Sequence, residues 1–266
     1  MRRNMRLAAI LLGAFCALVY LFLLAPIVVV VGASFNAGAF LTFPPQGLSL
    51  RWFVTFLENK VFIDALMTSL RLAAAATAIS TAIGVAAALY YERHAKAAKE
   101  SLRIGILLPL VLPEILTAIA LLFFFYQIGI GTRYWIALLV GHVLITLPFV
   151  FLNVVASLHG FDPNWELASR SLGAGPWTTF RRVTLPLMKP GLIIGGLFAF
   201  IISFDTFGIS FLLKDVGTAT LPLQLFDYLR FNFTPEAAAV STLSIGLTLI
   251  VVVLAENLVG LKTQRF

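Results

Sequence analysis

Apolar stretches long enough to cross a lipid bilayer recur along this chain and constrain its fold more than any other feature. A spanning helix needs about 20 mostly apolar residues, because each residue rises about 1.5 Å and the hydrocarbon core is about 30 Å thick. Six stretches reach this length with at most one acidic, basic or histidine residue each: 7–33, 72–91, 104–130, 134–158, 190–213 and 237–261. The sequence therefore predicts an all-α integral membrane protein with six transmembrane helices.

The composition argues against a soluble enzyme. Only 12% of the residues are charged and 60% are hydrophobic, whereas charged residues make up about 25% of soluble domains. The single cysteine, Cys16, excludes an internal disulfide and a cysteine-based zinc site. His142 has no second ligand four residues on, so we expect it to pack or to hydrogen-bond rather than to bind a metal. The chain has no glycine-rich phosphate loop ending in Lys and Ser or Thr. We therefore expect no catalytic residue, no ATP hydrolysis by this chain, no metal site and no cofactor.

The basic residues predict the orientation of the chain in the cell inner membrane. Most of the 19 Lys and Arg residues lie in the N-terminal tail, in the connections after the second and fourth runs, and in the C-terminal tail. Because cytoplasmic loops carry an excess of Lys and Arg, both termini and the segment 162–190 are expected in the cytoplasm. This placement beside membrane lipid also accounts for the net charge of +7, so no nucleic-acid partner is expected.

We expect two regions along the chain: an N-terminal helix with an external segment, residues 1–64, and a five-helix transmembrane core, residues 65–266. Apolar residues recur at helical spacing over 50–57, which predicts an amphipathic helix lying along the membrane surface. The connection 214–236 is long enough to hold a short helix over 223–229. These outer segments either contact an external partner or only cap the bundle.

The polar segment between the fourth and fifth runs carries local signals for two short helices. Asp162 followed by Pro163 is typical of a helix start, because the carboxylate accepts backbone hydrogen bonds and proline suits the first helical turn. Gly173 can take a left-handed conformation and stop that helix. A second helix is expected over 177–184, ending before Pro186, since a proline disfavours helical geometry at the residue before it. The sequence predicts a compact element that protrudes into water.

This segment resembles the EAA loop signature of the permease subunits of binding-protein-dependent ABC importers. In the best register Leu167 stands where the fullest signature has its acid, Ser169 stands at the second alanine, and Glu166 is the neighbouring acid that many members also have. Residues 68–91 resemble the first helix of the core that this family shares. The resemblance of the loop rests on Glu166, Ala168, Leu172, Gly173, Ala174, Phe180, Arg181, Val183, Leu185, Pro186, Pro190 and Gly191.

The resemblance implies a type I ABC importer permease fold and a mechanism. The loop would dock in a groove of a cytoplasmic ATPase subunit, so that ATP-driven closure of two such subunits moves two permease halves from inward-facing to outward-facing. The implied partners are a second permease subunit, either a paralogue or a copy, two ATP-binding subunits and an external solute-binding protein. For Arg181 and Arg182, contact with lipid headgroups is the alternative to contact with the ATPase. The residues implied in ATPase coupling are Glu166, Ala168, Leu172, Gly173, Ala174, Pro176, Arg181 and Arg182.

Two acids lie inside apolar runs, where a carboxylate costs about 2.5–3.5 kcal/mol and therefore needs water or a partner. Counted along their helices, Glu114 lies about 15 Å and Asp205 about 22 Å from the inner end. Together with Phe204, Thr206 and Phe207 they are candidates for a translocation path, in which aromatic faces would suit an ammonium group. The alternative for each acid is a structural polar contact.

Within the family, the chain looks most like the spermidine/putrescine-type subgroup, on the runs 203–213, 221–223 and 235–242. That subgroup commonly has a second acid after the residue matching Asp205, where this chain has Thr206. The resemblance implies a polyamine or related amine as the solute, with an aminophosphonate or ferric iron as alternatives. An ion channel or secondary transporter would explain the intramembrane acids but not the loop.

Overall fold

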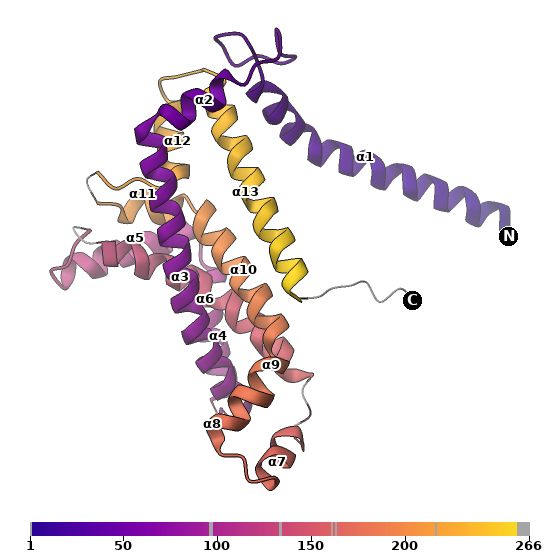
Figure 1. Ribbon diagram of the computed structural model, residues 1–266, viewed down its shortest axis with the longest axis vertical. Helices are drawn as coiled ribbons and strands as arrows, with labels where there is room; N and C mark the ends of the chain where they lie inside the picture. The colour runs from indigo at the N-terminus through magenta and orange to yellow at the C-terminus, as the bar shows by residue number, and fades with distance from the viewer. Residues whose placement is uncertain are drawn as a thin grey trace. The chain divides into compact units, whose positions relative to one another are not determined.

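The computed structural model describes residues 2–95, 98–132, 135–160, 162, 164–215 and 217–259. Within this part of the chain the secondary structure is helical, apart from one isolated antiparallel bridge between Asn36 and Leu48, which confirms the expected all-α fold. In chain order the elements of Figure 1 are α1 (Arg2–Ser34), α2 (Arg51–Glu58), α3 (Lys60–Arg93), α4 (Lys99–Val111), α5 (Glu114–Gln127), α6 (Trp135–His159), α7 (Asn164–Ser171), α8 (Pro176–Thr179), the π-helix η1 (Phe180–Thr184), α9 (Leu185–Leu187), α10 (Lys189–Asp205), α11 (Gly208–Leu213), α12 (Leu221–Leu229) and α13 (Glu236–Val259).

Four of these helices are long and apolar enough to cross a membrane, namely α3, α6, residues Ala9–Ser34 of α1 and residues Glu236–Leu258 of α13. Two bent pairs pass the same test when each is taken together: α4 with α5, and the helices from Pro176 to Leu187 with α10. The described part of the chain therefore holds four to six candidate spans. The expected number of six is reached when each bent pair counts as one span.

The third expected span, 104–130, is wrong as a single straight helix. α4 ends at Val111, α5 begins at Glu114, and the two helices are bent by 106°. Pro113 accounts for the break, because a proline disfavours helical geometry at the residue before it, and Leu112 is extended with φ −76° and ψ 140°. Glu114 therefore opens a new helix, and a depth counted along one straight helix does not apply to it.

The fifth expected span, 190–213, is interrupted as well. α10 ends at Asp205 and α11 begins at Gly208, so Thr206 and Phe207 form a short link between the two helices. Thr206 is extended, with φ −65° and ψ 129°. Both of the acids singled out in the sequence thus lie at helix breaks rather than inside regular helices.

The chain folds into two compact units. The first comprises Met1–Ile63 and Leu225–Leu247, and the second comprises Asp64–Gln224 and Thr248–Phe266. The divisions fall inside α3, α12 and α13, so these helices contribute to both units. The sequence also suggested a boundary after residue 64, but it assigned 225–247 to the transmembrane core.

In the first unit, the loop between α1 and α2 is built around the buried side chain of Asn36. Its amide donates hydrogen bonds to Phe40 O and Thr42 Oγ1, and its carbonyl oxygen accepts from two backbone N–H groups of the same loop. The Trp52 indole of α2 donates to Asn36 O at 2.9 Å. The two short outer helices expected from the sequence are present as α2 and α12.

The outer helices of the same unit are joined through the buried carboxylate of Glu236, at the start of α13. It accepts hydrogen bonds from Asn59 Nδ2 at 2.9 Å and from the Tyr228 hydroxyl at 2.8 Å. Burial raises the pKa of Tyr228 above its ordinary value, so the hydroxyl stays protonated and remains a donor. Because both carboxylate oxygens are occupied, Glu236 acts as a structural tie between α2, α12 and α13.

In the second unit α6 is the central helix, and α10 makes the most extensive contact with it. The helices approach closely because Gly191 and Gly195 present no side chain at the crossing. A Cβ at Gly191 would lie 2.3 Å from Asn153 O, and one at Gly195 would lie 2.9 Å from Val150 Cα. Two apolar clusters of buried residues fill this unit: Leu72, Ala76, Ala118, Phe125, Ala137, Leu138, Leu139, Ile145, Ile209 and Leu213 in one, and Ala88, Tyr91, Val150, Phe151, Val154, Met188 and Ala199 in the other.

Candidate functional site

The segment between α6 and α10 folds as a compact polar element, and Figure 1 places α7 and α8 at one end of the second unit. α7 begins as the sequence predicted, with the Asp162 carboxylate accepting a hydrogen bond from the Asn164 N–H at 2.9 Å. A side-chain oxygen in this position satisfies one of the free N–H groups of the first turn. The expected contribution of Pro163 to the helix start lies outside the described residues.

α7 ends in a glycine turn, which confirms the expected stop. Gly173 has φ +84°. Its N–H bonds to Arg170 O at 2.9 Å, and the N–H of Ala174 bonds to Ser169 O at 3.2 Å. These two bonds form a Schellman motif, which satisfies the last carbonyl groups of a helix and requires a left-handed residue. The direction in which the chain leaves α7 is therefore set by backbone hydrogen bonds.

The expected end of the second helix before Pro186 is wrong. α8, η1 and α9 follow one another without a gap from Pro176 to Leu187. In η1 the N–H of Leu185 bonds to Phe180 O, which is the wider π-helical pattern. A wider turn leaves room for the proline ring, which would clash with the preceding turn of a regular α-helix. The bend comes at Met188 instead, where α10 leaves at 67°.

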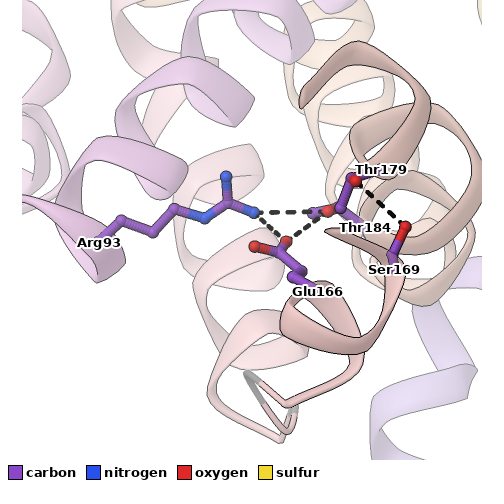
Figure 2. A network of polar contacts seen from close by, with 5 residues as sticks. All are labelled: Arg93, Glu166, Ser169, Thr179 and Thr184. Carbon is purple, nitrogen blue, oxygen red and sulfur yellow. Dashed lines mark hydrogen bonds and ion pairs between the residues drawn. The ribbon is translucent and has the colours of Figure 1, made fainter. Parts of the chain in front are cut away.

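Glu166 of α7 lies at the centre of a polar network, drawn in Figure 2. Its Oε1 accepts a hydrogen bond within an ion pair from the Arg93 guanidinium at the end of α3, and a second from Thr184 Oγ1 of η1 at 2.5 Å. The guanidinium also donates to Thr184 Oγ1 at 3.5 Å. The Glu166 side chain is only 14% exposed, so its carboxylate points into the loop rather than outward to a partner.

A second contact joins the two halves of the loop. Ser169 Oγ of α7 and Thr179 Oγ1 of α8 form a hydrogen bond of 3.1 Å (Figure 2), and Thr179 and Thr184 are both buried. Buried hydroxyl groups need partners, since an unpaired one costs about 1–3 kcal/mol. α7 is therefore held against α8 and η1 at two points.

An open groove of about 960 Å³ is formed by the same loop. Five of the residues expected to couple to an ATPase line it, and the other three, Glu166, Pro176 and Arg181, lie outside its lining although the structure describes them. The groove is lined by Trp165, Ala168, Ser169, Leu172, Gly173, Ala174, Gly175, Thr178, Arg182, Val183, Pro186 and Leu187.

Large apolar side chains of the loop are open to solvent. Leu172 is 89% exposed, Trp177 is 70% exposed and Trp165 is 51% exposed. Exposed aromatic and leucine side chains gathered on one element are typical of protein–protein contacts. Arg181 and Arg182 are exposed as well, so the apolar surface has a basic margin. This arrangement suits a partner surface that is apolar at its centre and acidic at its edge.

Glu114, the first residue of α5, contacts the link between α10 and α11. Its Oε1 accepts a hydrogen bond from Thr206 Oγ1 at 2.5 Å and another from the Ile209 N–H at 2.9 Å. The carboxylate thus satisfies a free N–H group in the first turn of α11. This is the structural polar contact that the sequence left open for Glu114. It brings Glu114 and Thr206 together beside Asp205, and a direct contact of Glu114 with solute stays a prediction.

Asp205 and the two phenylalanines of the expected path are placed differently. The Asp205 side chain is exposed and makes no hydrogen bond or ion pair with any other residue that the structure describes. Phe204 is buried and its ring stacks with Phe200. Phe207 is half-buried and its ring stacks with Phe211. Of these three side chains, the acid is the one available to a solute.

His142 of α6 braces the same helix break. Its Nδ1 lies 2.8 Å from Ser203 Oγ of α10, and its Nε2 lies 3.1 Å from Ser210 Oγ of α11. The ring is fully buried, and the expectation that His142 packs and hydrogen-bonds is confirmed. Among the described residues, no group of three or more His, Cys, Asp or Glu side chains could hold a metal ion.

Sequence reasoning missed Arg93, Thr179 and Thr184 as partners in the loop. Arg93 was one of several basic residues after the second run, and nothing beside it in the sequence sets it apart. The π-helical turn gives Thr184 an orientation that regular helical spacing does not predict. The usable signal was Glu166 itself, because an acid in a segment rich in basic residues favours an ion pair.

The family described as "Binding-protein-dependent transport system inner membrane component" matches residues 80–262. The spermidine/putrescine transport system permease protein PotC of Haemophilus influenzae is 32% identical over 244 residues, which is 92% of this chain and 94% of PotC. The putrescine transport system permease protein PotI of Escherichia coli is 31% identical over 251 residues, 92% of this chain and 87% of PotI.

A solved structure is similar over nearly the whole chain. It is a crystal structure of a bacterial ABC transporter involved in the import of the acidic polysaccharide alginate. One of its chains matches with a TM-score of 0.75 over 99% of this chain and 98% of that chain, at 16% sequence identity. At that identity the likeness concerns the fold.

Proposed function

We propose, from the premise that this chain belongs to the family of inner membrane components of binding-protein-dependent transport systems, that the solute it moves is a polyamine such as spermidine or putrescine. The chain is the permease subunit of an ABC importer and is a multi-pass protein of the inner membrane. It is a transport component, and ATP is hydrolysed in a separate subunit. Membership of this family removes the ion channel and the secondary transporter as alternatives.

The loop formed by α7, α8, η1 and α9 is the element through which ATP hydrolysis acts on this chain. The observation that carries this proposal is the groove beside Gly173, with the exposed side chains of Leu172 and Trp177 around it. Exposed apolar side chains gathered on one loop mark a surface that a partner covers. An ATP-binding subunit is that partner, and the exposed arginines of the loop favour an acidic margin on its docking face.

The complete transporter contains two ATP-binding subunits, a second permease subunit that is a paralogue of this chain, and an external solute-binding protein. Both termini and the loop 162–190 face the cytoplasm, on the strength of the basic residues beside them. The binding protein then delivers solute from the opposite face.

The polyamine proposal rests on charge as well as on the named relatives. Asp205 offers an exposed carboxylate in a membrane-spanning region. An unpaired acid there is tolerated only beside water or a cation, so the site favours a positively charged solute. The relatives PotC and PotI carry spermidine/putrescine and putrescine in their names.

Transport by the assembled complex tests this function. The chain is co-expressed with its partner subunits, reconstituted in vesicles, and supplied with the binding protein and radiolabelled spermidine. We expect uptake that requires ATP and falls when unlabelled putrescine is added. Vesicles that lack this chain are the control. ATP hydrolysis that is stimulated by the binding protein without any spermidine or putrescine uptake would contradict the polyamine assignment.

A further inference from the structure

The inner end of α3 is fastened to the loop by a contact that the proposed function does not require. Arg93 is the last residue of α3, and its guanidinium pairs with the Glu166 carboxylate of α7. The same carboxylate oxygen accepts the hydroxyl hydrogen of Thr184 in η1. One acid therefore joins two elements of the loop to the end of α3, which lies 73 residues earlier in the sequence (Figure 2).

α3 is suited to carry a displacement across the membrane. It runs unbroken for 34 residues from Lys60 to Arg93, a length of about 50 Å at 1.5 Å per residue. α4, α5, α10 and α11 are all shorter and are interrupted at Pro113 or at the link after Asp205. A displacement of the inner end of α3 is therefore transmitted along a single rod.

The loop is connected covalently to α6 on one side and to α10 on the other, and its Phe180 and Leu185 pack against the buried cluster that includes Ala88 and Tyr91 of α3. The ion pair adds a direct polar attachment of α7 to the end of α3. Glu166 and Thr184 also link α7 directly to η1. Movement of α7 is thereby passed to α3 as well as to α10.

The ion pair between Arg93 and Glu166 is expected to be stronger than an ordinary surface ion pair. The Glu166 side chain is 14% exposed and that of Arg93 is 35% exposed, so salt screens the pair less than a fully exposed one. Both hydrogen bonds to the carboxylate are charge-assisted, which makes them stronger than bonds between neutral groups. A cation at the C-terminal end of α3 is also favoured by the helix dipole.

We infer that Arg93 is a positioning residue that fastens α7 to α3 through Glu166, so that α3 and the coupling loop move as one body when the partner ATPases close on ATP. The inference rests on the proposed coupling role of the loop. It adds a second way in which movement of the ATPases is transmitted to this chain, through α3, which is not adjacent to the loop in the sequence.

A distance measurement in the assembled transporter tests this directly. Cys16 is exposed and is the single cysteine, so Cys16→Ser provides a background for spin labels at Tyr90→Cys of α3 and Arg170→Cys of α7. We expect the distance between the two labels to be the same in the nucleotide-free transporter and after trapping with ATP and vanadate. A shift of that distance on trapping, while ATP is hydrolysed normally, overturns the inference.

Two variants separate positioning from general stability. Glu166→Gln and Arg93→Lys are expected to make the label distance depend on nucleotide. We also expect the ATP hydrolysed per spermidine taken up to rise about threefold to fivefold. This fold-change corresponds to the upper end of the free energy that a partly exposed ion pair contributes. The matched control is Glu92→Gln, which removes the neighbouring pair with Lys99, 3.4 Å apart and outside the loop. The control is expected to leave both measurements unchanged.

The outcomes distinguish this inference from the function on which it rests. If no ATPase subunit assembles with the chain, the coupling function fails and the inference fails with it. If the transporter assembles and transports spermidine, a constant label distance in both Glu166→Gln and Arg93→Lys overturns the role of the ion pair alone. Partial restoration of the ATP-to-solute ratio by Arg93→Glu combined with Glu166→Arg would support it further.

Discussion

Gly173 ends α7 in a backbone conformation that other residues adopt only at a cost. Its φ of +84° lies in the left-handed region, and a Cβ there would meet open space. A substitution is therefore opposed by backbone strain and not by a clash. The same residue completes the Schellman motif that directs the chain from α7 into α8. A single conformational preference thus determines the angle between the two halves of the loop.

Replacing Gly173 by alanine is expected to weaken docking of the loop. The left-handed conformation costs an alanine about 1–2 kcal/mol, and the turn relaxes by changing the exit angle of α7. The measurement is the amount of ATPase subunit that co-purifies with the chain at limiting ATPase concentration. Gly160→Ala is the control, because Gly160 lies near the loop without a positive φ and its added Cβ meets no atom. Equal co-purification of the two variants would argue against the docking role of the turn.

Asp205 is the residue on which transport of a cationic solute is expected to depend most directly. We expect Asp205→Asn to lower spermidine uptake about tenfold, equivalent to about 1.4 kcal/mol, because the carboxylate is exposed and has no partner among the described residues. Assembly with the partner subunits should not change, since no contact within the chain is lost. Uptake is measured in vesicles, with Glu256→Gln as the control for removal of an exposed acid elsewhere in a span. Unaltered uptake by Asp205→Asn would remove this residue from the translocation path.

At the scale of elements, helix breaks position the polar groups that a membrane span otherwise cannot tolerate. Glu114 begins α5 after a 106° bend, and Thr206 lies in the link between α10 and α11. Each break frees backbone groups that need partners. The Glu114 carboxylate supplies a partner across the break, and His142 bridges its two sides from α6. The breaks are therefore held in a defined geometry by side chains of neighbouring helices.

The crossing of α6 and α10 is expected to be intolerant of any side chain at Gly191. A Cβ there would lie 2.3 Å from Asn153 O and 2.4 Å from Ser157 Oγ, so Gly191→Ala must push the helices apart. Overpacking of this kind costs about 1–3 kcal/mol or more. Thermal unfolding of the detergent-solubilised chain measures the loss. Gly196→Ala on the same helix is the control, since its Cβ would make only an ordinary contact with Thr77 at 3.8 Å. The expectation fails if both variants unfold at the same temperature.

At the scale of the whole molecule, the described helices provide four continuous candidate spans and two bent pairs. A count of four spans and a count of six, with each bent pair taken as one span, both return the chain to the side of the membrane on which it began. An even number of spans agrees with the basic residues beside both termini and the loop. In the proposed orientation the loop lies on the cytoplasmic side, where it meets the ATP-binding subunits.

Accessibility of introduced cysteines checks that orientation. In the Cys16→Ser background, Phe40→Cys in the outer loop and Trp177→Cys in the coupling loop are matched in exposure, at 73% and 70%. With the chain expressed without its ATPase, a membrane-impermeant maleimide is expected to label Phe40→Cys in intact cells. Trp177→Cys should react only after the inner membrane is permeabilised. The reverse pattern would place the coupling loop outside the cell.

The sequence by itself determined the features that depend on neighbours along the chain. The apolar runs predicted the membrane class, and Asp162 and Gly173 predicted the ends of α7, because a helix cap and a left-handed glycine act within a few residues. The EAA-like pattern led to the importer family. Local signals could not predict which prolines interrupt a helix. Pro113 ends its helix, whereas the helical segment around Pro186 continues because the π-helical turn η1 leaves room for the proline ring.

Only the tertiary structure decided which polar groups meet. Glu114 pairs with a threonine 92 residues away, and Glu166 pairs with an arginine 73 residues away. Glu114 is exposed and Glu166 is half-buried, and in each case any of several residues could have supplied the partner. The packing of α3, α5, α6 and α10 selects one. That selection turned Glu114 into a support for the α10–α11 break, and it made Arg93 a partner of the coupling loop.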